Sequence, residues 1–70
     1  MTNTELKEAL LNKKSVVVTL NDGTEIKCKC VYGITYREKN GKILVQAELI
    51  DVNGKCRYNC SPKQIRYESN

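Results

Sequence analysis

The sequence predicts a mainly β fold, in which an N-terminal α-helix precedes five antiparallel strands that form a small, partly open barrel. Apolar residues have helical spacing only in the first part of the chain and alternate with polar residues from residue 15 onward. Turn signals that contain Asp-Gly or Asn-Gly separate the alternating runs. Six Leu, five Ile and six Val supply enough apolar volume for one thin core. We expect a single domain over residues 1–70, with the helix at about 2–14 and the barrel at about 15–68.

The first expected element is a short amphipathic helix. Leu6, Ala9 and Leu10 have the i, i+3, i+4 spacing that places side chains on one helical face. Thr2 and Glu5 have the spacing of a capping box, which marks the N-terminal end of a helix. A helix of about three turns is not stable alone in water. Its apolar face must therefore pack against the strands.

Four strands should follow the helix as a meander. Period-two alternation and β-branched residues mark residues 15–20, 24–36, 42–51 and 55–60. Hairpin signals separate these runs at residues 21–23, 39–41 and 53–54. Because each connection is short, consecutive strands should pair antiparallel.

Side-chain alternation predicts which face of the second strand is buried. The even positions are mostly apolar, and the odd positions include Lys and Arg. We therefore expect the core face to carry Ile26, Cys28, Cys30, Tyr32, Ile34 and Tyr36. A three-residue loop at residues 21–23, in which Gly23 takes the left-handed conformation, keeps the first strand on this face. The resulting pairs are Val18 with Ile26 and Val16 with Cys28.

The last part of the chain should add a helical turn and a fifth strand. A turn at Asn53-Gly54 places Leu49 opposite Tyr58 and Ala47 opposite Cys60. Pro62 ends the fourth strand because it fixes φ and has no N–H to donate. Residues 61–64 suit one tight helical turn, and residues 65–67 suit a very short strand. Gly33 allows the long second strand to bend and to contribute to two small sheets.

The predicted order of elements resembles the SH3-like barrel and, within that group, the Sm-like proteins, which place an N-terminal helix before five bent strands. The stretch SVVVTLNDGTEIKCKCVYG looks like the first two strands of an Sm-like domain, and the closing SPKQIRY is similar to the end of many SH3-like barrels. The sequence departs from the Sm-like pattern where that family lines its RNA pocket. Cys28 stands where a Gly is expected, and the fourth strand reads CRYNCSP without an Arg-Gly pair. The resemblance therefore implies the fold, and it implies neither ring assembly nor uridine binding.

The four cysteines fall into two closely spaced pairs: Cys28, Cys30, Cys56 and Cys60. Two such pairs suggest a zinc site, but C-x-C and C-x-x-x-C spacings within strands hold the side chains too far apart for easy convergence on one ion. Disulfides meet the same geometric obstacle, and a reducing compartment disfavours them further. Free cysteine is also a common core residue. We expect buried, reduced, metal-free thiols, with zinc coordination by the four cysteines and disulfides as the alternatives.

The opposite face of the predicted sheet carries a basic group: Lys27, Lys29, Lys55 and Arg57. In a chain with a net charge of +4, such a group is one way to follow a phosphate backbone. Acidic Glu48 and polar Gln46 interrupt the group on the intervening strand, and no aromatic side chain is expected there to stack on a base. The pattern fits both a solvated sheet face and a nucleic-acid-binding surface.

Composition excludes several classes of function. The chain has no His, so neither a Ser-His-Asp nor a Cys-His catalytic centre can form. One thin core leaves little room for an enclosed active site, and no apolar run is long enough to cross a bilayer. We expect a non-enzymatic, cofactor-free, cytoplasmic binding or adaptor module with a protein partner and no membrane contact. The alternatives are a nucleic-acid-binding protein of the SH3-like or Sm-like kind and a small zinc-stabilised domain.

Overall fold

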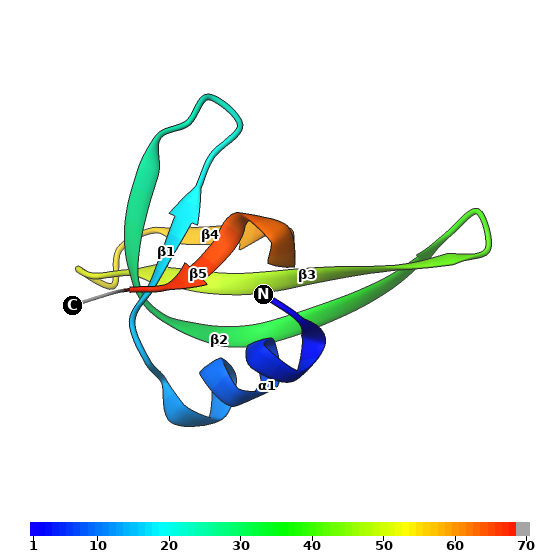
Figure 1. Ribbon diagram of the computed structural model, residues 1–70, viewed down its shortest axis with the longest axis horizontal. Helices are drawn as coiled ribbons and strands as arrows, with labels where there is room; N and C mark the ends of the chain where they lie inside the picture. Colours follow the sequence, from blue (N-terminus) through cyan, green and yellow to red (C-terminus); the bar gives the residue numbers. More distant parts are fainter. Residues whose placement is uncertain (69–70) are drawn as a thin grey trace.

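One helix and five strands make up most of the chain in the computed structural model, which describes residues 1–68 (Figure 1). The elements are α1 (Asn3–Asn12), β1 (Val16–Thr19), β2 (Glu25–Lys39), β3 (Lys42–Asp51), β4 (Arg57–Cys60), the 3-10 helix η1 (Pro62–Gln64) and β5 (Ile65–Tyr67). The strands pair antiparallel in one sheet of order β4-β3-β2-β1-β5. The predicted mainly β class, with an N-terminal helix and a five-stranded antiparallel sheet, is confirmed. Barrel closure stays a prediction.

Helix α1 is capped and packed as its sequence predicts. The Thr2 hydroxyl accepts a hydrogen bond from the Glu5 N–H at 3.2 Å, and the Thr2 N–H donates to the Glu5 carboxylate at 3.0 Å. Leu6 and Ala9 are buried where α1 packs against β2, and Leu10 is half-buried. No helix within residues 1–68 has the length and apolar run that a membrane crossing requires.

The predicted register of the first hairpin is confirmed. Val18 lies opposite Ile26 and Val16 lies opposite Cys28. The three-residue loop that sets this register has Gly23 at φ 90°, and the Leu20 N–H donates to the Thr24 carbonyl at 2.8 Å. All three valines of β1 are buried.

The register of the β3–β4 hairpin is also as predicted, but its turn is wider than two residues. Leu49 lies opposite Tyr58, and Ala47 lies opposite Cys60. The Asp51 carboxylate accepts hydrogen bonds from the N–H groups of Lys55 at 2.8 Å and Cys56 at 3.2 Å, so β4 begins only at Arg57. These donations, first that of Cys56, lower the pKa of the Asp51 carboxyl.

The alternation predicted for β2 fails between its two bulges and is restored from Ile34 onward. Two bulges, between the ladder partners Cys28 and Cys30 and between Val31 and Gly33, each add a residue to β2 and shift its parity. Val31 is consequently buried at an odd position. Tyr32 and Tyr36, which were expected in the core, are 36% and 54% exposed.

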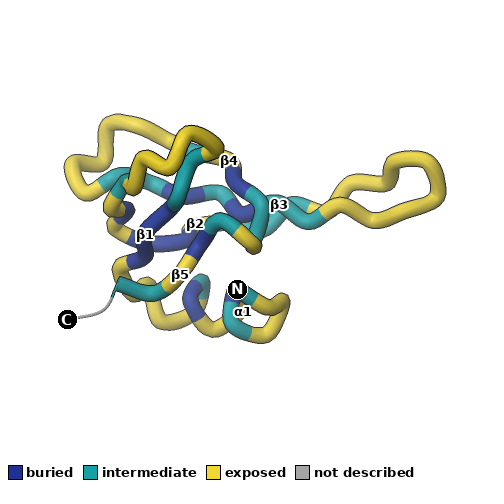
Figure 2. The backbone as a smooth tube through the Cα atoms, turned by 45° about the horizontal axis from the view of Figure 1, so that its top comes forward, coloured by how far each residue is buried: buried dark blue, intermediate teal, exposed yellow. Residues whose placement is uncertain are grey.

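The buried residues gather in the curled part of the sheet and beneath α1, which we call the body (Figure 2). The core consists of Leu6, Ala9, Val16, Val18, Cys28, Val31, Ala47, Leu49, Cys60 and Ile65. α1 and all five strands contribute to it, so one core holds the whole body together.

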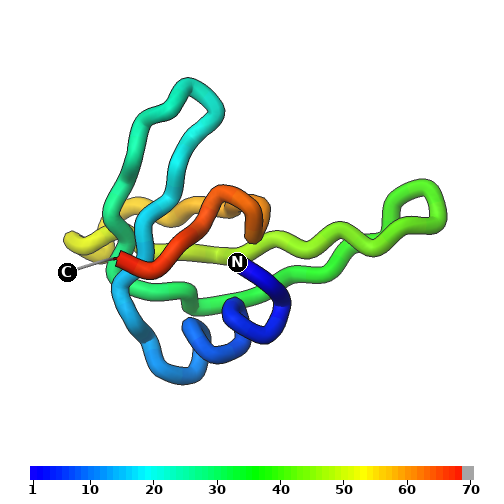
Figure 3. The backbone as a smooth tube through the Cα atoms, viewed as in Figure 1, coloured from blue at the N-terminus to red at the C-terminus, as the bar shows by residue number. Residues whose placement is uncertain are grey.

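Strands β2 and β3 continue out of the body as a two-stranded arm, residues 35–46 (Figures 1 and 3). In this region β2 and β3 pair only with each other, because β1 pairs with β2 at residues 25–28 and β4 pairs with β3 at residues 47–50. Asn40 at φ 53° and Gly41 at φ 79° form the two-residue turn at the tip. Residues 36–44 of the arm are therefore exposed, and only residues 35, 45 and 46 at its base are half-buried.

Candidate interaction surface

Three of the four cysteines are buried in the body. Cys28, Cys30 and Cys60 are buried as predicted, whereas Cys56 is exposed because it belongs to the turn before β4; all four are free thiols. Within residues 1–68, no three His, Cys, Asp or Glu side chains are arranged to hold a metal ion. Burial raises the pKa of the Cys28 thiol to about 11 and also raises the pKa of Cys60. These two thiols are protonated at neutral pH and are poor nucleophiles.

The basic residues predicted as a surface are all exposed: Lys27, Lys29, Lys55 and Arg57. Two of them are engaged by neighbouring side chains. The Lys27 ammonium lies 3.2 Å from the Glu68 carboxylate, and the Arg57 guanidinium lies over the Tyr32 ring, 5.4 Å from its centroid. The expectation that no aromatic ring lies beside this group is thus wrong, because the bulges bring Tyr32 to the surface.

The other two predicted residues lie farther along the sheet. Lys29 lies at the first bulge of β2, and Lys55 lies in the β3–β4 turn, where its N–H is bonded to Asp51. Neither lysine forms an ion pair with any residue in the described part of the chain.

Ion pairs neutralise the outer face of the body over β1. Lys27 and Arg66 are the two cross-strand partners of Val17, and they pair with Glu68 and Glu25, respectively. These pairs flank Val17, which is buried although its face points away from the core. This part of the predicted basic surface consequently carries little free charge.

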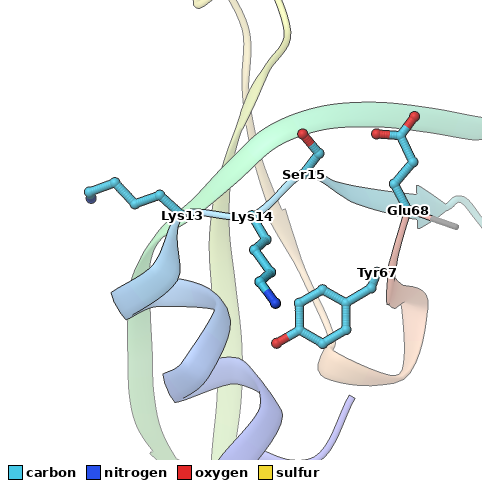
Figure 4. Close-up of a pocket in the computed structure, with 5 residues that line it drawn as sticks. All are labelled: Lys13, Lys14, Ser15, Tyr67 and Glu68. Carbon is cyan, nitrogen blue, oxygen red and sulfur yellow. The ribbon is translucent and has the colours of Figure 1, made fainter. Parts of the chain in front are cut away.

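A shallow pocket of about 560 Å³ lies where the end of α1 meets β5 (Figure 4). In it the Lys14 ammonium lies 5.8 Å from the centroid of the Tyr67 ring, and the Tyr67 hydroxyl donates to the Glu5 carbonyl at 3.2 Å. Glu68, which also lines the pocket, is the partner of Lys27. The lining groups tie the helix to the sheet, and the mixture of charges favours neither an anion nor a cation.

The arm carries the largest group of exposed apolar side chains. Ile43 is 72% exposed and Leu44 is 45% exposed, and Tyr36 lies opposite Val45 on the neighbouring strand. Tyr36, Ile43 and Val45 share one face, which continues the core face of β3 beyond the body.

The opposite face of the arm is basic. Arg37, Lys39 and Lys42 lie on it together with Leu44, and Lys39 lies directly opposite Lys42. None of these three basic side chains forms an ion pair with another residue of the range 1–68. The one acidic residue of the arm, Glu38, accepts a hydrogen bond from the Gly41 N–H at 3.0 Å. The arm therefore presents both uncovered apolar surface and unneutralised positive charge.

A groove of about 570 Å³ lies at the base of the arm. Residues 43–45 of β3 form one side of it, residues 61–63 form the other, and residues 1–3 also line it. We call this the edge groove. The Met1 ammonium donates to the Pro62 carbonyl at 2.6 Å and to the Ile65 carbonyl at 3.2 Å, which joins the N-terminus to η1 and β5.

Sequence reasoning predicted the hairpin at residues 39–41 but missed the arm as a surface. The signal was present in KILVQ, where apolar residues occupy both odd and even positions and so cannot all face one core. Comparison with known proteins adds no assignment, because no protein-family model, curated protein or solved structure matches this chain.

Proposed function

We propose that this protein is a non-enzymatic binding module that contacts a partner protein through the arm. The observation that carries the proposal is the exposure of Tyr36, Ile43 and Leu44, which lie together on the arm and are not among the core residues. Apolar groups that are not needed for packing, and that lie together rather than singly, are typical of interaction sites.

The rest of the molecule supports a binding role. Both pockets are open and shallow, and the absence of His removes the usual general base. The thiols of Cys28 and Cys60 are protonated and buried. A body with one small core is a suitable scaffold for holding a projecting hairpin in a defined direction.

Removing the apolar side chains of the arm tests this proposal. The arm variant is Tyr36→Ser with Ile43→Ser, and the matched control is Leu11→Ser with Val52→Ser, which removes two exposed apolar residues from outside the arm. Proteins captured from a lysate of the native cells by the wild-type protein and by the control, but not by the arm variant, would support the arm as the contact surface. Capture that survives in the arm variant, or fails equally in both variants, would contradict it.

Nucleic acid is the second candidate partner, and the basic face of the arm favours it. A two-stranded ribbon fits the major groove of DNA, and Arg37, Lys39 and Lys42 would contact phosphates. Three such contacts predict a slope of about −2 to −3 when log affinity is plotted against log salt concentration. Fluorescence anisotropy with labelled duplex DNA and single-stranded RNA should then show loss of binding in Lys39→Glu/Lys42→Glu, with Lys27→Glu/Lys29→Glu as the comparison within the body. Weak, salt-independent binding would remove this candidate.

A further inference from the structure

The β3 side of the arm is an open sheet edge. β3 pairs with β4 only at residues 47–50, and β4 ends at Cys60, just before Pro62 turns the chain into η1. Residues 43–45 of β3 therefore have β2 on one side and the edge groove on the other. The position that β4 would occupy if it continued is empty of protein strand.

The backbone groups of Ile43 and Val45 point toward this open position. Lys39 and Lys42 flank a two-residue turn and so exchange hydrogen bonds, which turns the next residue, Ile43, away from β2. At the other end of β3, Asp51 donates its N–H to Cys56 on the β4 side at 3.0 Å. The extra residues of both bulges belong to β2, so the odd residues of β3 all point the same way.

These backbone groups have no partner within residues 1–68. No hydrogen bond joins the N–H or C=O of Ile43 or Val45 to another part of the described chain outside the β2–β3 ladder. Two donors and two acceptors are thus spaced as a neighbouring strand would require.

The surroundings of this edge select an acidic occupant. Lys42 lies at one end of residues 43–45, and Lys63 lines the groove wall; neither forms an ion pair with a described residue. A second copy of the chain is disfavoured, since it carries a net charge of +4 and would bring its own Arg37, Lys39 and Lys42 to the same place.

We propose that the open edge of β3, at Ile43 and Val45, binds an extended acidic peptide segment of a partner protein as an added β-strand. The main chain of the peptide would supply the ladder, and alternate apolar side chains would cover Ile43 and Val45 while carboxylates meet Lys42 and Lys63. This inference rests on the proposed function and identifies the class of partner that the arm takes.

Amide hydrogen exchange, followed by NMR, tests the added strand directly. The probe is a synthetic, terminally blocked peptide of alternating Glu and Val, and the control peptide has Lys in place of each Glu. With the Glu-Val peptide, exchange at the Ile43 and Val45 amides should slow by about tenfold or more. Exchange at Lys42 and Leu44 should change little, because their N–H groups are already bonded to β2. The proposal would be overturned if the Glu-Val peptide bound without slowing exchange at alternate amides of β3. Equal binding of the Lys-Val peptide, or no binding at millimolar peptide, would also overturn it.

A backbone variant separates this mechanism from the broader proposal. Ile43→Pro removes the outward N–H, a position where an edge strand tolerates proline, whereas Ile43→Ala keeps the N–H and shortens the side chain. Ile43→Ala should retain peptide binding and Ile43→Pro should lose it. If Ile43→Pro captures the same partner as wild type while the Tyr36→Ser/Ile43→Ser variant does not, the arm is the contact surface and strand addition is wrong. Protection of Ile43 and Val45 that grows with protein concentration alone would instead identify a second copy as the occupant.

Discussion

The body and the arm are built from the same two strands, β2 and β3, but they bury their side chains to opposite extents. Leu49 and Ile43 lie on the same face of β3, yet Leu49 is fully buried and Ile43 is largely exposed. The difference comes from the neighbours of the strand pair. In the body β1 and β4 pair with β2 and β3 and α1 packs against β2, whereas no third strand pairs with the arm. A pleated strand pair buries side chains only where another element packs on it.

This contrast separates apolar residues that stabilise the fold from those that are free for another role. Core residues of the body cannot change without loss of packing. The exposed residues of the arm are under no such constraint, so their apolar character needs a different explanation. Contact with a partner is the explanation that the proposed function gives.

Substitution at the two ends of β3 should produce the largest difference between body and arm. Leu49→Ala leaves a cavity in the core and should lower the free energy of unfolding by about 2–5 kcal/mol. Ile43→Ala removes an exposed side chain and should change it by less than about 0.5 kcal/mol. Urea denaturation of both variants measures the two values. A similar loss in both would show that the arm packs against the body in solution.

Local patterns in the sequence were sufficient for much of the body. The capping box at Thr2 and Glu5, the loop ending in Gly23 and the parity of β3 each depend on residues close together in the chain, and each is confirmed. The core face of β1 and the burial of Cys28 follow from those registers.

The parts that sequence reasoning missed depend on distant residues. Parity along β2 fails between the two bulges, because the first inserted residue reverses the facing and the second restores it, and so Tyr32 is exposed. Tyr36 lies on the predicted face but is exposed because it belongs to the arm. The arm exists because β1 begins only at Val16, opposite Cys28, and β4 ends before Pro62, so that β2 and β3 extend beyond their partners. Where the partner strands begin and end is set by separate turns, and within β3 only the apolar run at residues 43–45 departs from the pattern of a one-sided strand.

The body, unlike the arm, buries an ionisable side chain, and this should make it sensitive to alkali. Burial raises the pKa of Cys28 from its usual 9.0 to about 11, so the folded protein holds the proton over a pH range in which the unfolded chain releases it. Stability should therefore be unaffected by Cys28 below about pH 9 and should fall between about pH 9 and 11.

The variant Cys28→Ala isolates this effect from the other groups that titrate in the same range. The measurement is the free energy of unfolding as a function of pH in wild type and variant. Between about pH 9 and 11 this free energy should fall more steeply in wild type, with a difference in slope that corresponds to the release of up to about one proton on unfolding. Identical slopes would mean that Cys28 ionises as freely in the folded protein as in the unfolded chain.

The smallest expected effect is a change in the stability of the arm when one of its surface charges is reversed. On the outer face of the body, basic side chains meet carboxylates, as in the Lys27–Glu68 pair. On the arm, Lys39 instead lies directly opposite Lys42, and like charges in that arrangement destabilise a hairpin.

Lys39→Glu replaces this repulsion with attraction and should stabilise the arm by about 0.2–1 kcal/mol, seen as slower exchange of the hairpin amides at Lys42 and Leu44. The gain should shrink as salt is added, because the pair is exposed. Lys29→Glu is the control, since it also reverses one exposed lysine but lies at a bulge of β2, where it has no cross-strand partner in the ladder. Unchanged amide exchange in Lys39→Glu would mean that the facing Lys39 and Lys42 side chains do not lower the stability of the arm in the wild-type protein. A gain in arm stability accompanied by weaker binding of the Glu-Val peptide would show that the natural sequence retains repulsion on the arm because the positive charge is needed for an acidic partner.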